Sequence, residues 1–193
     1  MSCLPSRLPW EQTCCFRLLR SVWLRYRSFS LVSDPALLLD GIREYQEIGI
    51  GPPIWQNLHE LLDRSYHSLH VADVRIEEEG TGVEILADAL FEKVIYNLMD
   101  NTLRYGGRVT RIRCSVPDTS SPLILFEDDG IGIADQDKET IFSLGFGQNT
   151  GFGLFISREI LSISNMTIRE TGEAGSGARF EIQIPAACIR PIQ

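Results

Sequence analysis

Apolar side chains in the second half of the chain recur at two different spacings. In residues 89–104 they return every three or four positions, which predicts an amphipathic helix with one buried face. Asp88 stands where a helix N-cap is expected, and Gly106 and Gly107 mark the end of the pattern. Residues 153–163 repeat the helical spacing directly after a glycine-rich stretch. These two segments therefore predict two helices that pack on a core.

Six short runs are apolar, or alternate between apolar and polar residues, and each is bounded by turn-forming residues. They predict strands at residues 73–78, 83–86, 109–116, 123–127, 166–170 and 178–184. Gly80-Thr81-Gly82 joins the first two runs and predicts that they pair as a hairpin, and residues 136–142 predict a short helix. This order predicts an α/β fold of the α+β type: a two-layer α/β sandwich in which helices cover a mixed, mostly antiparallel sheet.

The chain divides into three zones. Residues 1–34 are basic and irregular, residues 35–68 predict two short helices, and residues 69–187 hold the α/β body. Pro52 and Pro53 are expected to end the first of the two helices and to begin the second, because proline is tolerated in a first helical turn. A chain of 193 residues fits one domain with appendages.

Charge is unevenly distributed along the chain. The net charge is −8, whereas residues 1–33 alone contain five arginines against one glutamate. No nucleic-acid partner is expected, because phosphate backbones need a basic footprint on the folded domain. Apolar residues of the basic segment fall at helical spacing, so it fits either an interfacial amphipathic helix or a partly ordered extension. These residues are Phe16, Leu19, Val22, Trp23 and Tyr26.

The five cysteines are scattered and form neither a C-x-x-C pair nor a disulfide framework, which favours a reducing cytoplasm. No apolar run reaches the roughly 18 residues that a membrane span needs. Arginines interrupt the apolar residues near the N-terminus every few positions, unlike the apolar core of a signal peptide. A cytoplasmic location without a membrane span in this chain is therefore expected.

Polar residues suited to ligand binding follow these elements in a fixed order. Asn97, Asn101 and Arg104 lie at positions i, i+4 and i+7 of the predicted helix and share one face. Asp128 ends an apolar strand, where its carboxylate can accept a hydrogen bond from an adenine amine. Four glycines within residues 145–153 precede a helix, whose first N–H groups favour anions. Together these features predict an ATP pocket without a Walker loop, with amide oxygens for a magnesium ion.

Five motifs in this order resemble the N, G1, F, G2 and G3 boxes of the GHKL superfamily. They are Asn97 to Asn101, Asp128-x-Gly130-x-Gly132, Ile141-Phe142, Gly151-x-Gly153-Leu154 and Gly175-x-Gly177. More closely, the chain resembles the catalytic ATP-binding domain of two-component sensor histidine kinases over about residues 73–185. This resemblance implies the Bergerat type of α/β sandwich. Residues 45–49 and 53–56 also resemble the segment before this domain in some archaeal-type kinases.

Position by position, the resemblance implies a site for ATP and Mg²⁺. Asp128 is expected to bind the adenine amine, and Tyr105 to pack near adenine or ribose. Asn97 and Asn101 are expected to hold magnesium, and with Arg104 they form the expected catalytic set at the phosphates. Residues 143–150 would form a mobile lid. The expected nucleotide-binding residues are Asn97, Asn101, Arg104, Tyr105, Asp128, Gly130, Gly132, Ile133, Thr150, Gly151, Gly153 and Leu154.

Three features depart from the pattern of the family. Phe155 replaces the last glycine of the G-x-G-L-G motif, which is expected to narrow the helix start, and Ala178 replaces a threonine that often supports the adenine network. The third is the phosphoacceptor, which normally lies on a helical hairpin well before the N box. His59 lies too close to Asn97 for such a hairpin, so we read it as an ordinary helix residue and expect the acceptor on another chain.

The resemblance implies transfer of the ATP γ-phosphoryl group to a histidine. A phosphoacceptor domain or response regulator in trans, and a second copy of the chain in a homodimer, are the expected partners. Two alternatives stay open: a non-catalytic ATP-binding signalling module and an anti-sigma-factor-type serine kinase. Asn97 weakens the second alternative, and ATP hydrolysis with it, because such relatives use a glutamate base there and an amide takes no proton.

Overall fold

A computed structural model describes residues 48–70, 73–117, 122–146 and 151–192 of the chain. The basic segment at residues 1–34 and the helix expected before Gly49 lie outside the described residues, as does Thr150. Among the described residues, no helix is both long enough and apolar enough to span a membrane.

The described chain forms eight strands, three α-helices and two short 3₁₀ helices. The strands are β1 (Ile54–Asn57), β2 (Arg75–Glu79), β3 (Val83–Ala87), β4 (Arg111–Ser115), β5 (Leu123–Asp128), β6 (Thr167–Glu170), β7 (Arg179–Gln183) and β8 (Ile189–Pro191). The helices are α3 (Leu58–Ser68), α4 (Phe91–Tyr105), η2 (Thr140–Phe142), α5 (Gly153–Ile163) and η3 (Ala186–Cys188).

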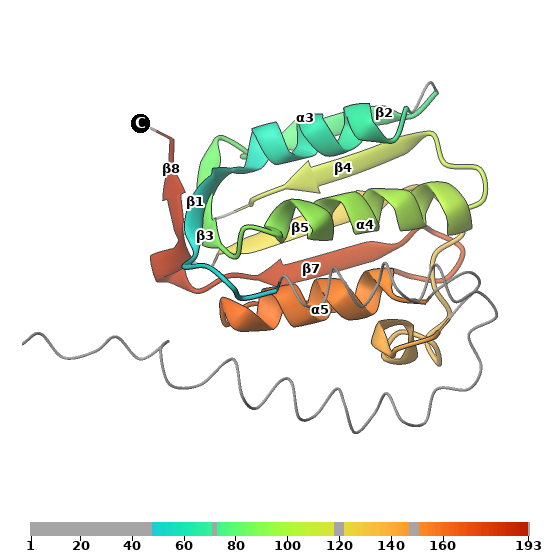
Figure 1. Ribbon diagram of the computed structural model, residues 1–193. Coiled ribbons are helices and arrows are strands. Elements are labelled where there is room, and N and C mark those ends of the chain that lie inside the picture. The colour runs from blue at the N-terminus through green and yellow to red at the C-terminus, as the bar shows by residue number, and fades with distance from the viewer. Residues whose placement is uncertain (1–47, 71–72, 118–121, 147–150, 193) are drawn as a thin grey trace, which may run out of the picture.

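The larger sheet has the strand order β2-β4-β5-β7-β6, and the β2–β4 pair is parallel whereas the other pairs are antiparallel. Helices α3, α4 and α5 lie together over one face of this sheet, with α4 in contact with both of the others (Figure 1). The opposite face carries arginine and glutamate side chains that pair between strands, among them Arg113 with Glu79 and Arg179 with Glu127. The expected two-layer α/β sandwich with a mixed, mostly antiparallel sheet is therefore confirmed.

A second, three-stranded sheet has the order β1-β3-β8, with both pairs antiparallel. The predicted hairpin of residues 73–78 and 83–86 is wrong, because β2 pairs with β4 and β3 pairs with β1 and β8. The turn at Gly80 has the expected positive φ of 69°. It redirects the chain from one sheet to the other instead of folding it back onto the same sheet.

The expectation that Pro52 and Pro53 begin a helix is also wrong. Strand β1 follows the two prolines, and α3 begins at Leu58. The Asn57 side chain accepts a hydrogen bond of 3.3 Å from the Glu60 N–H and so forms the N-cap. Pro53 disfavours helical backbone at the residue before it, Pro52, so no helix begins at the first of the two prolines.

The two predicted core helices are present. Helix α5 spans the predicted residues, and α4 begins two residues later than expected, at Phe91. Asp88 still shapes this start, because its Oδ1 accepts from the Leu90 N–H at 2.9 Å and its Oδ2 from the Gly49 N–H at 2.9 Å. The short helix expected over residues 136–142 is reduced to the 3₁₀ turn η2 after a series of turns.

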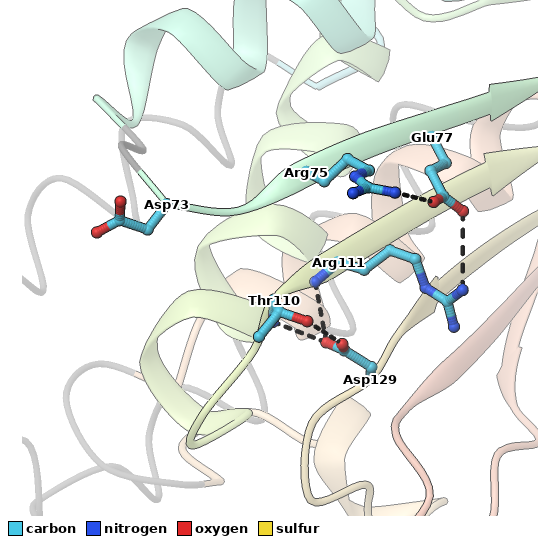
Figure 2. Close-up of a pocket in the computed structure, with 6 residues that line it drawn as sticks. All are labelled: Asp73, Arg75, Glu77, Thr110, Arg111 and Asp129. Carbon is cyan, nitrogen blue, oxygen red and sulfur yellow. Dashed lines mark hydrogen bonds and ion pairs between the residues drawn. The ribbon is translucent and has the colours of Figure 1, made fainter.

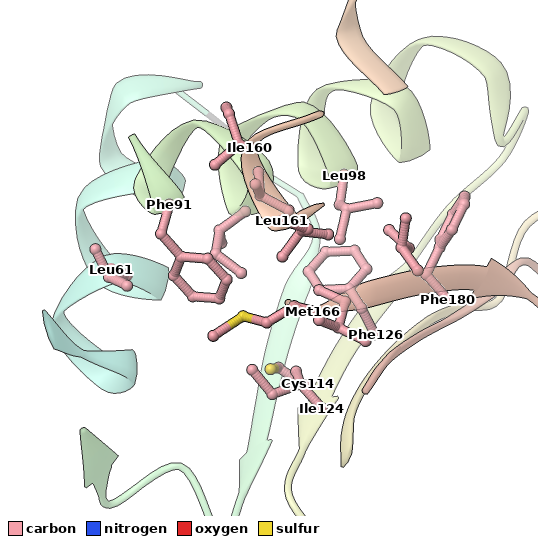
Figure 3. Packing of buried hydrophobic residues seen from close by; sticks show 14 of the residues in the cluster. Leu61, Phe91, Leu98, Cys114, Ile124, Phe126, Ile160, Leu161, Met166 and Phe180 are labelled. Carbon is pink, nitrogen blue, oxygen red and sulfur yellow. The ribbon is translucent and has the colours of Figure 1, made fainter. Parts of the chain in front are cut away.

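One hydrophobic core fills the space between the helices and the larger sheet (Figure 3). Phe91 and Leu98 of α4 and Phe126 of β5 are fully buried at its centre. Cys114 of β4 belongs to the same cluster, and burial raises the pKa of its thiol far above the ordinary value. This core fixes α4 and β5 relative to each other, and these two elements carry most of the candidate site.

Candidate functional site

Asp128 ends β5 with its carboxylate held from three sides. Its Oδ1 accepts from the Gly130 N–H at 2.9 Å and from the Ala178 N–H at 3.1 Å. Its Oδ2 accepts from the Thr102 hydroxyl at 2.9 Å. Strand β5, the loop after it, the start of β7 and helix α4 therefore all converge on one carboxylate, which stays partly exposed.

Backbone segments around Asp128 approach one another where glycine removes the side chain. Gly177 has a φ of 103°, and a Cβ there would overlap the carbonyl oxygen of Asp128. A Cβ on Gly130 would lie 2.5 Å from the carbonyl oxygen of Gly106 at the end of α4. Gly177 thus permits close backbone packing, because any side chain there would push the loop away from Asp128.

Two further residues of the G1 loop were expected to bind nucleotide. Gly132 has a φ of 68°, and a Cβ there would lie 2.7 Å from the carbonyl oxygen of Glu173. Ile133 is partly buried against the core. Ile131, which lies between Gly130 and Gly132, is 62% exposed, and its N–H donates to the Gly106 carbonyl at 2.9 Å. The loop is thus bound to the end of α4 through its backbone.

Thr102 is the residue of this cluster that sequence reasoning missed. It lies in α4 one position after Asn101, is 3% exposed and donates its hydroxyl to Asp128. Its signal in the sequence was faint: a polar, β-branched residue on the apolar side of a predicted helix, where a leucine or alanine is more usual. The pairing with Asp128 joins residues that lie far apart along the chain, so spacing alone could not reveal it.

Asn97 joins α4 to the first turn of α5. Its side chain is 7% exposed, and its Nδ2 donates to the Gly153 carbonyl at 2.9 Å and to the Ser157 hydroxyl at 3.1 Å. A Cβ on Gly153 would lie 3.7 Å from the Asn97 Oδ1. The amide is therefore oriented with its nitrogen on α5, which leaves Oδ1 as its ligand atom beside the start of that helix.

Asn101 lies one turn further along α4 and is partly buried. Its Nδ2 is buried and has no hydrogen-bond partner within the described residues. A buried amide group without a partner is costly, typically about 1–3 kcal/mol. An amide without a partner, one helical turn from Asn97, is expected of a side chain that binds a ligand.

Arg104 and Tyr105 end α4 at the surface. The Arg104 Nε lies 2.7 Å from both oxygens of Asp100, and its side chain is 55% exposed. The hydrogen bond that Arg104 donates to Asp100, together with the negative charge of Asp100, raises the pKa of Arg104. Tyr105 is 42% exposed. Arg104 is thus held within its own helix, and a contact with phosphate would require it to leave Asp100.

The G2 glycines stand at the entrance to α5. The Gly145 N–H donates to the Gly151 carbonyl at 3.2 Å, which brings together the two ends of the glycine-rich loop. Gly153 opens α5, and Leu154 is partly buried against the core. Phe155, which replaces a family glycine, is 6% exposed and packs in the core.

A second carboxylate follows directly after Asp128 but serves the other side of the sheet. Asp129 accepts from the Thr110 hydroxyl and backbone N–H and from the Arg111 N–H, at 2.5, 2.9 and 3.0 Å (Figure 2). Burial alone would raise the pKa of Asp129, but these hydrogen bonds outweigh it and lower the pKa to about 2. Asp129 thus braces the loop without facing the Asp128 cluster.

Asp129 also lines an open pocket of about 390 Å³ on this side. Arg75 and Arg111 both pair with Glu77 there, at 3.5 and 3.8 Å (Figure 2). The pocket is lined by Asp73, Arg75, Glu77, Thr110, Arg111 and Asp129. The charged groups of Arg75, Arg111 and Glu77 pair with one another, and Asp129 is hydrogen-bonded, which is typical of a solvated sheet face.

His59 lies on the exposed side of α3, with its side chain 60% exposed. Its Nδ1 lies 2.9 Å from the Glu78 Oε2, and this hydrogen bond and the charge of Glu78 raise the pKa of His59. No group of three or more histidine, cysteine or acidic side chains among the described residues is arranged to hold a metal ion. A magnesium ion at the candidate site would therefore rely on amide oxygens and on the ligand itself.

The chain matches the model of one protein family over residues 86–187, which covers α4, β5, α5 and both glycine loops. The family is described as histidine kinase-, DNA gyrase B- and HSP90-like ATPase. The matched residues include all the candidate site residues named above.

Two relatives are a sensor histidine kinase and a sensor protein. The chain is 32% identical to the sensor histidine kinase GtrS of Pseudomonas aeruginosa over 124 residues, which is 60% of this chain and 26% of GtrS. It is 32% identical to the sensor protein ChvG of Agrobacterium fabrum over 136 residues, which is 61% of this chain and 22% of ChvG. The chain therefore spans about a quarter of the length of these relatives.

Solved structures share the fold. The Acinetobacter baumannii histidine kinase AdeS superposes with a TM-score of 0.62 at 21% sequence identity, over 88% of this chain and 84% of that one. At this level of identity the likeness establishes the fold, and the function has to be argued from the site.

Proposed function

Because the chain belongs to the family of histidine kinase-, DNA gyrase B- and HSP90-like ATPases, we propose that it binds ATP as the catalytic domain of a sensor histidine kinase. In this role it transfers the γ-phosphoryl group to a histidine on another chain. The observation that carries the proposal is the Asp128 carboxylate, held by three donors and still partly exposed at the end of a buried strand. A carboxylate fixed in this way accepts from an amine of one defined orientation.

Adenine recognition depends on the hydrogen-bond acceptor position of Asp128 that the protein itself does not use. An ionised carboxylate accepts about four hydrogen bonds, and three of these are used within the protein. The remaining position suits the exocyclic amine of adenine and repels the carbonyl oxygen of guanine. Gly130 and Gly132 keep the loop close to α4, so the base can approach the carboxylate.

Phosphate binding rests on the start of α5. The N–H groups of a first helical turn have no partner inside the helix and, with the helix dipole, favour anions. Gly153 and Leu154 begin this turn, and Gly151 lets the preceding loop close on Gly145. Thr150 would add a hydroxyl from that loop, and Arg104 would contact phosphate after leaving Asp100.

Asn97 and Asn101 fit a magnesium ion. The Asn97 amide is oriented by Gly153 and Ser157, so its Oδ1 is left for a ligand. The buried nitrogen of the Asn101 amide has no partner within the described residues, and rotation about its last side-chain bond would present its oxygen instead. Amide oxygens suit Mg²⁺, which usually binds through few protein groups and the phosphates of the substrate. Bound there, the ion would neutralise charge on the phosphates.

The reaction class follows from Asn97. Hydrolysis would need a base that takes a proton from water, and an amide cannot take one. Phosphoryl transfer needs little proton chemistry from the protein and depends on positioning and charge. Asn97 and the start of α5 therefore suit transfer of the phosphoryl group to an acceptor that arrives with its own nucleophile.

A second candidate function is a non-catalytic ATP-binding signalling module. His59 favours it, because this histidine lies exposed on α3 and is paired with Glu78 instead of standing on an acceptor hairpin. In either role, partners would be a phosphoacceptor domain or response regulator in trans and a second copy of the chain. Scattered cysteines, of which Cys114 and Cys188 are free, favour a reducing cytoplasm.

The test uses the full chain in two steps. Calorimetric titration with ATP in the presence and absence of Mg²⁺ is expected to show binding that Mg²⁺ strengthens. The chain is then incubated with radiolabelled ATP and a helical-hairpin acceptor domain, with one histidine, from a sensor kinase that it resembles. An acid-labile label on that histidine supports the kinase. Binding without label transfer favours the signalling module, and no ATP binding overturns both.

A further inference from the structure

We infer that Thr102 is a positioning residue that sets the base selectivity of the pocket by orienting the Asp128 oxygen that receives the adenine amine. The inference rests on the proposed ATP binding and adds to it a residue outside the expected nucleotide-binding set. It starts from one contact, the 2.9 Å hydrogen bond from the Thr102 hydroxyl to the Asp128 Oδ2.

The two oxygens of Asp128 have different partners. Oδ1 accepts two backbone N–H groups, from Gly130 and Ala178, and so both of its lone pairs are engaged. Oδ2 accepts from Thr102 alone within the described residues. An incoming amine must therefore donate to Oδ2, which is the oxygen that Thr102 holds. Thr102 and the amine of the base share one acceptor atom.

The position of Thr102 makes its hydroxyl selective. A threonine inside a helix commonly donates to the carbonyl four residues earlier, which here is Leu98. Thr102 instead donates across to β5 from a position in α4 that is only 3% exposed. A β-branched side chain has few rotamers in a helix, so the direction of this hydroxyl is well defined.

Ala178 explains why the hydroxyl comes from α4. At this position the chain offers Asp128 its backbone N–H, at 3.1 Å, and no side-chain donor. The side-chain hydroxyl that reaches the carboxylate therefore comes from Thr102, from the opposite wall of the site. The hydroxyl group that Ala178 lacks is thus supplied by α4, the helix that also carries Asn97 and Asn101.

Thr110 provides a matched control. Its hydroxyl donates to the Oδ2 of Asp129, the next carboxylate along the chain, on the side of the sheet away from the Asp128 cluster. Thr102→Val and Thr110→Val each remove one threonine hydroxyl from one aspartate in the same loop. A general loss of loop stability would affect both variants, whereas a role in base recognition affects Thr102→Val alone.

The experiment measures affinities of the full chain for Mg-ATP and for purine riboside triphosphate, an ATP analogue without the 6-amino group. Thr102→Val is expected to weaken ATP binding about tenfold, because a hydrogen bond to a charged group is lost from the receiving oxygen. It should weaken binding of the analogue less than about twofold, since the analogue does not use Oδ2. Thr102→Ser, which keeps the hydroxyl, should restore most of the ATP affinity.

The outcomes separate this inference from the function it rests on. If the wild-type chain binds neither nucleotide, ATP binding itself is wrong. If it binds ATP and Thr102→Val weakens both nucleotides equally, or Thr110→Val matches the effect on ATP, Thr102 has a structural role and the inference is overturned. Melting temperatures of the three variants test whether each is folded, and Thr102→Ala, which also removes the hydroxyl, carries the test if Thr102→Val does not fold.

Discussion

Replacing Asp128 by asparagine tests the pocket at its most constrained atom. The Gly130 and Ala178 N–H groups both point at Oδ1 and require an oxygen there. The new amide must therefore keep its oxygen at Oδ1 and place its NH₂ group at Oδ2. The Thr102 hydroxyl can turn and accept from this NH₂ group, so the loop can keep its structure. The variant changes one acceptor into a donor with little other change.

The size of the effect follows from that exchange. ATP loses a hydrogen bond to a charged acceptor, worth about 1.5–3 kcal/mol, or roughly 10- to 150-fold in affinity. The amine of adenine then also faces another donor, so we expect a loss of about 100-fold. The affinity for GTP should rise instead, because the carbonyl oxygen of guanine can accept a hydrogen bond from the new NH₂ group. The preference for ATP over GTP should therefore shrink or reverse.

Calorimetric titration of Asp128→Asn with Mg-ATP and Mg-GTP measures this change. Asp129→Asn is the matched control, because its carboxylate binds Thr110 and Arg111 on the other side of the sheet. The ATP affinity of the control should stay within about twofold of the wild-type value, because Asp129 is not expected to form a hydrogen bond with the base. Unchanged ATP binding in Asp128→Asn, or equal losses in the two variants, would refute the assignment of Asp128.

Three further predictions concern other parts of the domain. Asn97→Asp places a carboxylate against the Gly153 carbonyl, so we expect a melting temperature lower by several degrees and weaker Mg-ATP binding, measured by calorimetry. His59→Ala should leave labelling of the acceptor domain by radiolabelled ATP unchanged. A phosphohistidine mapped to residue 59 would contradict the proposal that the acceptor histidine lies on another chain. Asp129 has a pKa of about 2 instead of 3.8, so its stabilisation is full above about pH 4 and is lost as the pH falls through about 2. The melting-temperature difference between wild type and Asp129→Asn should stay constant from pH 7 to 5 and shrink below 4; a constant difference down to pH 2 would show that the hydrogen bonds with Thr110 do not couple to protonation.

The sequence predicted the elements whose signals are local. Helix α5 was found with its bounds, because its glycines and its apolar spacing lie within one stretch of chain. The sandwich followed from the order of the predicted helices and strands, and the family followed from five motifs in order. Asp128 and Asn97 were predicted as site residues because each occupies a defined place in a motif.

The parts that were missed depend on contacts between distant residues. Gly80 looked like the turn of a hairpin, but pairing partners are chosen by the whole sheet, and β4 and β1 were better partners for the two strands. Strand β1 has four residues and runs straight into α3, so no turn separates the strand from the helix. Thr102 acts on Asp128 through space, and nothing beside it in the sequence indicates that partner.

The parallel pairing of β2 with β4 joins two strands that β3 and α4 separate in the chain. Strand pairings between residues so far apart form slowly during folding, and without β2 the strand β4 presents an open edge. In the finished fold β2 takes over that edge with five consecutive residues of which four are charged, which discourages pairing with another chain. Strand β2 thus protects the folded domain from edge-to-edge aggregation.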